Sequence, residues 1–248
     1  MVSAWATRCR LVLGQIAVRD KSNEITAIPA LLKGLDIAGC VVTIDAMGCQ
    51  RQIAAQLIAQ QADYVLQVKG NQPILYERLQ KLFAGAQEYN FQGLRMHYAK
   101  KVNKGHGRVE DRQCWVVSDE SWLLYLQGDP LKPKWSGLKS VVKMVRKRDE
   151  DQAAESYYIT SLACDADRLM HNIRSHWGIE TSLHWVLDIA YREDESRVRK
   201  GHGAENLAIL RHLTLNLLKQ ETSLKCGIHA KRLRVGWDKR YMIKVLDI

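Results

Sequence analysis

The segment Cys40-Val41-Val42-Thr43-Ile44-Asp45 decides the fold class. It is a run of mostly β-branched residues without polar alternation, which is typical of a strand buried on both faces in a parallel sheet. A helical pattern follows at residues 51–60, a second apolar run at residues 64–68, and another helical pattern at residues 73–83. Strand, helix, strand and helix at this spacing predict an α/β layer with right-handed crossovers.

The flanking residues extend this layer on both sides. Residues 1–6 and 11–18 have the composition of two short strands, and a helical pattern begins at residues 22–24. Beyond residue 85 a basic loop is expected at residues 100–108. Strand candidates follow it at residues 114–117, 140–145 and 156–161. After residue 165 the pattern is helical to about residue 219, and a basic tail follows. We therefore expect core segments at residues 1–84 and 165–248, separated by a β-rich insertion at residues 85–164.

The charge of the chain points to its partners rather than to its fold. Lys and Arg total 37 against 27 Asp and Glu, which gives a net charge of +10. Nucleic acid is the commonest partner of such a surface, and an anionic membrane is the second. The apolar stretches are shorter than a membrane span, and Arg8 and Arg10 interrupt the apolar stretch that a signal peptide needs. We expect a cytoplasmic protein without a membrane partner.

The six cysteines do not indicate a metal centre. Their positions are 9, 40, 49, 114, 164 and 226, so no Cys-x-x-Cys pair occurs. This spacing suggests neither a zinc site nor a disulfide framework. Buried, reduced thiols are the expected state.

Asp45 ends the first strand of the predicted layer. Ligands of open α/β sheets bind beyond the carboxyl ends of the strands, which makes Asp45 a candidate metal ligand. Capping of the following helix is the alternative, and it is favoured when the pattern is taken alone because caps are far commoner than metal ligands.

Glu180 lies in a predicted helix at residues 167–188. The apolar stripe of this helix comprises Leu169, Ile173, Trp177, Leu183 and Leu187, and Glu180 follows Ile173 by seven residues, within the stripe. A buried carboxylate must be paired, protonated or bound to a cation. His176 and His184 stand four residues to either side, so a buried His–Glu pair is one alternative and a transition-metal site is another.

Several basic segments could contact phosphate. Lys69-Gly70-Asn71-Gln72 lies between a strand and a helix, where a glycine and free helix N–H groups suit a phosphate, although a plain turn fits equally well. Basic stretches at residues 100–112, 143–148 and 192–200 are either solvated faces or phosphate contacts. Trp115, Trp122 and Trp135 lie near them and could stack on unpaired bases.

Taken together, these segments resemble the DDE transposases of the ISAs1 type, which include the H-repeat-associated proteins of enteric bacteria. The resemblance covers nearly the whole chain. It rests on Thr43-Ile44-Asp45-Ala46-Met47-Gly48-Cys49-Gln50, on Ala62-Asp63-Tyr64-Val65-Leu66-Gln67-Val68-Lys69-Gly70-Asn71-Gln72, on Gly105-His106-Gly107-Arg108-Val109-Glu110-Asp111-Arg112 and on Arg174-Ser175-His176-Trp177-Gly178-Ile179-Glu180. Ile173, His176 and Leu187 depart from the Tyr, Arg and Lys of the broader group's signature.

The resemblance implies an RNase H-like catalytic domain with a β-rich insertion before the last catalytic helix. It implies an Asp-Asp-Glu triad that holds two Mg²⁺ ions, in which Asp45 is the second Asp and Glu180 is the Glu, both catalytic and both metal ligands. It also implies contacts to transposon-end and target DNA, for which the candidate residues are Lys69, Asn71, Arg108, Arg112, Arg174 and His176. A second copy of the chain is a further candidate partner.

One part of the family pattern is missing from the sequence. The family's first Asp stands in an Asp-Gly-Lys motif on a strand before the segment that matches Met1, and these 248 residues do not contain that motif. We therefore expect a truncated copy with an incomplete triad, at most weak Mg²⁺ binding and little or no strand transfer. The alternatives are a non-catalytic DNA-binding remnant and, with less support, a metal-dependent nuclease in which His176 and His184 bind the metal.

Overall fold

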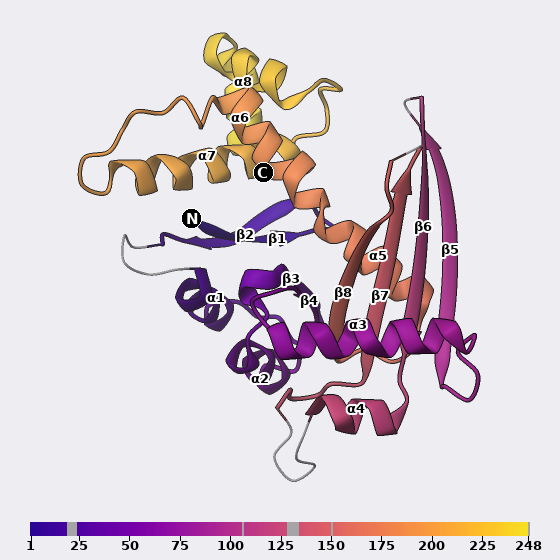
Figure 1. The fold of residues 1–248 in the computed structure, drawn as a ribbon. Helices are drawn as coiled ribbons and strands as arrows, with labels where there is room; N and C mark the ends of the chain where they lie inside the picture. Colours follow the sequence, from indigo (N-terminus) through magenta and orange to yellow (C-terminus); the bar gives the residue numbers. More distant parts are fainter. Residues whose placement is uncertain (19–23, 106, 128–133, 150, 248) are drawn as a thin grey trace. The chain divides into compact units, whose positions relative to one another are not determined.

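The fold is mixed α/β. The computed structural model describes residues 1–18, 24–105, 107–127, 134–149 and 151–247 (Figure 1). These residues divide into two compact units, which we call the sheet unit (residues 24–174) and the helical unit (residues 1–23 and 175–248).

A six-stranded sheet in the order β3-β4-β8-β7-β6-β5 forms the centre of the sheet unit. Only β3 and β4 are parallel, with Ile44 opposite Leu66, and the other neighbours are antiparallel. The strands are β3 (Val41–Ile44), β4 (Asp63–Val68), β5 (Met96–Gly105), β6 (Arg108–Val117), β7 (Ser140–Arg148) and β8 (Ala154–Thr160).

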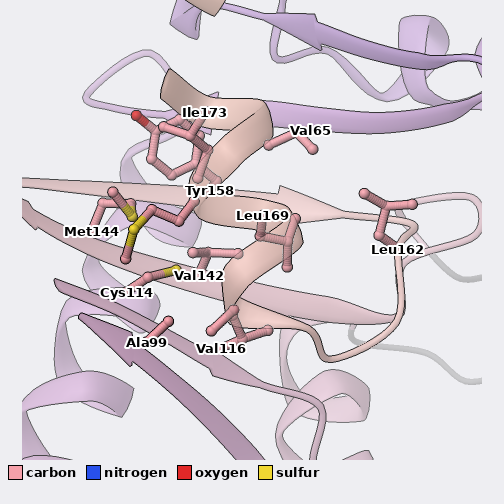
Figure 2. Packing of buried hydrophobic residues seen from close by; sticks show 12 residues of the cluster. Val65, Ala99, Cys114, Val116, Val142, Met144, Tyr158, Leu162, Leu169 and Ile173 are labelled. Carbon is pink, nitrogen blue, oxygen red and sulfur yellow. The ribbon is translucent and has the colours of Figure 1, made fainter. Parts of the chain in front are cut away.

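Helices cover both faces of this sheet. Tyr157 and Tyr158 are neighbours on β8 and therefore point to opposite faces. On one face the ring of Tyr157 contacts Phe83, at 6.0 Å between centroids, from α3. On the other face Leu169 and Ile173 of α5 pack in a core with Tyr158 (Figure 2). The helices of the unit are α1 (Glu24–Lys33), α2 (Arg51–Ala59), α3 (Pro73–Glu88), α4 (Glu120–Gln127) and α5 (Ala166–His176). The last two residues of α5, 175 and 176, belong to the helical unit.

Strand β3 is less buried than its sequence predicts. Its four residues are half-buried, because β3 lies at the end of the strand order. The prediction of a strand covered on both faces is therefore wrong for β3. The predicted strand at residues 64–68 is confirmed as β4, and these five residues are all buried. An apolar β-branched run does not distinguish an edge strand from a central one.

The predicted basic loop at residues 100–108 is wrong. Most of these residues belong to β5 and β6, which pair continuously from Met96 opposite Val117 to Gly105 opposite Arg108. The Lys100 Nζ lies 3.0 Å from Asp111 Oδ2 on the partner strand. Cross-strand ion pairs of this kind allow a lysine-rich segment to form a strand.

The β-rich insertion is part of the same sheet as the preceding strands. β8 pairs with β4, with Val65 opposite Thr160, and β7, β6 and β5 follow outward. The compact units therefore divide the chain near residues 23 and 174, whereas the sequence suggests boundaries at residues 84 and 164.

The helical unit begins with the antiparallel pair β1 (Val2–Ala6) and β2 (Leu11–Ile16). Val12, Leu183, Leu187 and Leu215 form its core. The Asn216 side chain accepts a bond from Val12 N at 3.0 Å and donates to Val12 O at 2.8 Å, so α7 pairs with the outer edge of β2. The remaining elements are a π-helical turn at Glu180–His184, α6 (Trp185–Tyr191), α7 (Gly203–Gln220), α8 (Ile228–Trp237) and α9 (Lys239–Leu246).

The cysteines are only partly buried, and the described helices include no candidate membrane span. Cys49 and Cys114 are buried free thiols as expected, but Cys9, Cys40 and Cys226 are exposed free thiols. Among the described residues, no helix combines the length and apolarity that crossing a bilayer requires.

The packing of α5 on the sheet predicts a stability effect. Leu169 is fully buried, whereas Leu124 on α4 is 42% exposed. Leu169→Ala leaves a cavity and should lower the free energy of unfolding by about 2–5 kcal/mol. Leu124→Ala should change it by less than about 0.5 kcal/mol. Urea denaturation of both variants measures the difference, and equal losses would contradict this description of the core.

Candidate functional site

Asp45 lies at the carboxyl end of the parallel strand pair. It directly follows Ile44 of β3, and Lys69 directly follows Val68 of β4. Because β3 and β4 run in the same direction, the two loops begin at the same edge of the sheet. The predicted position of Asp45 beyond a strand end is thus confirmed.

The Asp45 side chain is exposed and does not cap a helix. Asp45 stands at the N-cap of the short 3₁₀ helix η1 (Ala46–Gly48), where its carboxylate accepts no capping hydrogen bond among the described residues. The longer helix α2 begins after Gln50 instead. The capping alternative is therefore wrong, and Asp45 is exposed.

The loop after β4 holds the turn after β3. The Asn71 side-chain amide donates to Ala46 O, and Gln72 Nε2 donates to Cys49 O at 2.9 Å. Asn71, a predicted DNA contact, thus has its amide engaged within the protein. The sequence places Asn71 and Gln72 in the next loop but does not show what their side chains contact.

The inner side of the turn is closely packed. Gly48 is buried, and a Cβ on it would lie 2.3 Å from Cγ2 of Ile44 and 2.9 Å from Cδ1 of Ile28. Burial also raises the pKa of the Cys49 thiol to about 12, so this thiol stays neutral. The turn after β3 therefore packs closely on its inner side and carries one exposed carboxylate, that of Asp45.

Glu180 is exposed, which contradicts the predicted burial. Leu169 and Ile173 pack in the core of the sheet unit, whereas Leu183 and Leu187 pack in the core of the helical unit. The apolar stripe is therefore divided between two cores. In the sequence, Glu180 lies between the residues that pack in one core and those that pack in the other. The carboxylate therefore needs no buried partner and is open to solvent.

Local helix geometry explains part of this error. Trp177 is 49% exposed although it was predicted to lie in the stripe. The segment from Glu180 to His184 is π-helical, so residues four apart do not stack as they do in an α-helix. Single π-helical turns are frequent at functional sites.

The histidines near Glu180 do not support a transition-metal site. Across the described part of the chain, no three His, Cys, Asp or Glu side chains gather closely enough to hold a metal. The His176 ring lies 5.7 Å from that of Trp177, and His184 is exposed. Burial, with a smaller contribution from His184, lowers the pKa of His212 to about 4, so that histidine is neutral at pH 7.

The predicted DNA contacts differ in their surroundings. Lys69, Arg108 and Arg174 are exposed. Arg112 is only 8% exposed, and its guanidinium bonds to Glu110 and, at 2.7 Å, to Asn103 Oδ1. Burial lowers the pKa of Arg112, and Arg174 Nη1 lies 3.5 Å from the same oxygen of Asn103. Arg112 is thus an internal ion-pair partner, whereas Arg174 remains accessible.

The strand register reveals cations that sequence reasoning did not group. Glu110 Oε1 lies 3.8 Å from Arg146 Nε and 3.4 Å from Arg148 Nε, both on β7. Arg112, Arg146 and Arg148 therefore surround a single carboxylate, with Arg174 nearby through Asn103. The β6–β7 register, with Arg112 opposite Arg146, is the signal that brings them together.

The three tryptophans expected near DNA are either buried or in contact with another aromatic ring of the protein. Trp135 is only 2% exposed, so base stacking is wrong for this residue. Trp115 packs on Tyr98 with 5.1 Å between ring centroids, and Trp122 contacts Tyr125 at 5.7 Å.

Comparison with known proteins identifies the family. Residues 1–217 match the family described as "Transposase DDE domain". The chain belongs to this family of DDE transposases. The match carries with it an RNase H-like fold, in agreement with the mixed α/β architecture, and DNA as the family's partner.

Relatives of this chain align over almost all of its length. It is 40% identical over 252 residues to "Putative transposase YncI" of Escherichia coli O157:H7, covering 99% of this chain and 63% of that protein. It is 35% identical over 254 residues to "H repeat-associated putative transposase YhhI" of Escherichia coli K12, covering 99% and 65%. The chain thus spans less than two thirds of the length of these relatives.

The packing of the turn after Asp45 predicts a stability effect. Gly48→Ala should lower the free energy of unfolding by about 1–3 kcal/mol, because the new Cβ overlaps Ile44 and Ile28. Gly85→Ala on α3 is the matched control, since its Cβ would meet open space, and it should stabilise the helix by up to about 1 kcal/mol. Thermal or urea unfolding compares them, and a neutral Gly48→Ala variant would contradict the described packing.

Proposed function

We propose that Asp45 and Glu180 are two of the metal-binding carboxylates of a DDE transposase site that cuts and joins DNA strands. The observation that carries the proposal is the exposed, uncapped carboxylate of Asp45 beyond β3 in a chain that belongs to this family. Glu180 is likewise exposed and begins a π-helical turn. Family resemblance supports assigning the two carboxylates to one site.

The donor chemistry of these residues suits the expected metal. Mg²⁺ prefers hard oxygen ligands and retains several waters, so it needs few protein carboxylates. A bound Mg²⁺ pair would supply charge to activate an attacking oxygen and to stabilise a leaving one. Asp45 and Glu180 would hold such ions, and the fixed turn would keep the Asp45 oxygens in a constant position.

We further propose that this chain alone carries out little or no strand transfer. Its 248 residues contain no Asp-Gly-Lys motif, which in the resembled family supplies the first carboxylate. Two carboxylates without the shared third ligand should bind one ion weakly. Without the first carboxylate of the triad, a second ion would have no ligand in common with the first.

DNA is the partner that the charge of the chain supports. The net charge is +10, and Lys69, Arg108 and Arg174 are exposed. Contacts from these side chains to phosphates would position a duplex without reading its sequence. The predicted cytoplasmic location and a homo-oligomeric state are compatible with this role and remain part of the proposal.

A cleavage assay tests the catalytic proposal. The chain is incubated with Mg²⁺ and DNA that carries the element's ends, and the products are resolved on a denaturing gel. We expect at most trace cleavage, which disappears in Asp45→Ala and Glu180→Gln but persists in Glu88→Gln, a control at an exposed residue of α3. Robust cleavage that is lost in Asp45→Ala would overturn the proposed inactivity but support the role of Asp45. Robust cleavage that survives both substitutions would contradict the site.

A second function, DNA binding without catalysis, is favoured by the arginines around Glu110. It predicts a dissociation constant that rises steeply with salt, because phosphate contacts release counterions. Glu180→Gln should leave the affinity unchanged, whereas Arg148→Ala should weaken binding to all sequences and reduce the salt slope by about one. Fluorescence anisotropy at several salt concentrations measures both effects. Failure to bind any DNA at low salt would contradict this function.

A further inference from the structure

The turn that carries Asp45 has few bonds of its own. Within it, Cys49 N donates to Ala46 O at 3.1 Å, and Gln50 N donates to Gly48 O at 2.9 Å. The 3₁₀ helix η1 is only three residues long. Such a short helix is not stable by itself, so its conformation depends on contacts from elsewhere.

Those contacts come from the loop after the neighbouring parallel strand. Asn71 donates to Ala46 O at the start of the turn, and Gln72 Nε2 donates to Cys49 O at 2.9 Å near its end. Gln72 Nε2 also lies 3.4 Å from Gln50 Oε1. The two side chains, both from the loop after β4, therefore bond to both ends of the turn.

Gln72 makes these bonds instead of capping its own helix. It occupies the N-cap position of α3, but its side chain forms no capping bond there among the described residues. From the inner side, Ile44 and Ile28 leave no room for a side chain on Gly48. The turn is thus confined between an apolar base and two amide groups.

We infer that Asn71 and Gln72 are positioning residues that fix the Asp45 carboxylate for metal binding. Asp45 directly precedes Ala46, whose carbonyl receives the Asn71 bond, and the backbone of Asp45 is extended, with φ −69° and ψ −177°. That carbonyl belongs to the Ala46–Met47 peptide unit, one residue beyond Asp45, so holding it restrains the backbone that leads away from the carboxylate. The metal-binding part of this inference rests on the proposed function, whereas the locking of the turn does not. The inference replaces the predicted DNA contact at Asn71.

Residues that support a metal ligand usually affect metal affinity strongly. Loss of such a partner typically weakens binding about 10–100-fold. A residue that only connects two elements would instead lower overall stability and leave the ligand's geometry intact. Local order and metal affinity therefore distinguish a positioning role from a merely structural one.

The test uses Asn71→Leu and Gln72→Met, which keep approximate side-chain size and remove the amide donors. Gln80→Met, at an exposed position of α3, is the matched control. Amide hydrogen exchange is measured without metal on peptides covering residues 44–50 and 51–59. We expect exchange about tenfold faster in residues 44–50 of both variants, unchanged exchange in residues 51–59, and no effect of Gln80→Met.

Titration with Mn²⁺, followed by electron paramagnetic resonance, supplies the second measurement. Both variants should bind Mn²⁺ about tenfold more weakly than the wild-type chain, with Asp45→Ala as the reference for loss of the ligand. Unchanged exchange in residues 44–50 would overturn the inference whatever the metal does. Faster exchange with unchanged, Asp45-dependent Mn²⁺ affinity would overturn the positioning role. Binding that does not depend on Asp45 would instead overturn the proposed function, and the exchange data alone would then decide whether the two amides lock the turn.

Discussion

The parallel pairing of β3 with β4 is the constraint on which the candidate site depends. It is the only parallel pair among the described strands, and it brings the loops after Ile44 and Val68 to one edge of the sheet. An antiparallel pair would place those loops at opposite edges. Because the loops meet, Asn71 and Gln72 can bond to the turn after β3, and the backbone at Asp45 is held although its carboxylate makes no capping bond to the described residues.

The same arrangement explains why the carboxylate is available for a ligand. A buried or capping carboxylate would spend its oxygens on protein donors, whereas Asp45 and Glu180 are both exposed and are not held in internal ion pairs with lysine or arginine in the described structure. The arginines, in contrast, gather around Glu110, where strand register brings them together. The two exposed carboxylates thus follow β3 and lie in the π-helical turn, whereas the arginines around Glu110 lie on β6 and β7.

The sequence predicts the strands and helices of residues 41–88, but it misses β5, α4, α8 and α9 and mispredicts the burial of several residues. Periodicity locates β4, α2 and α3 closely, because those elements are covered by the rest of the sheet unit. It locates β3 but not its burial, because an apolar run also suits an edge strand. It fails for residues 100–105, where the cross-strand ion pair of Lys100 with Asp111 offsets part of the charge. Glu180 lies where helical spacing expects burial, but its helix serves two cores and has a π-helical turn. The bonds of Asn71 and Gln72 depend on which loops meet, and a sequence pattern does not contain that information.

We propose from the family resemblance that Asp45 and Glu180 serve one metal-binding site. A double-mutant cycle on Mn²⁺ affinity tests it most directly, with Asp45→Asn, Glu180→Gln and the double variant compared with the wild-type chain. If both carboxylates hold the same ion, each single variant loses most of the binding and the double variant loses little more. Single variants that bind Mn²⁺ as tightly as the wild-type chain, or losses that simply multiply in the double variant, would contradict the claim.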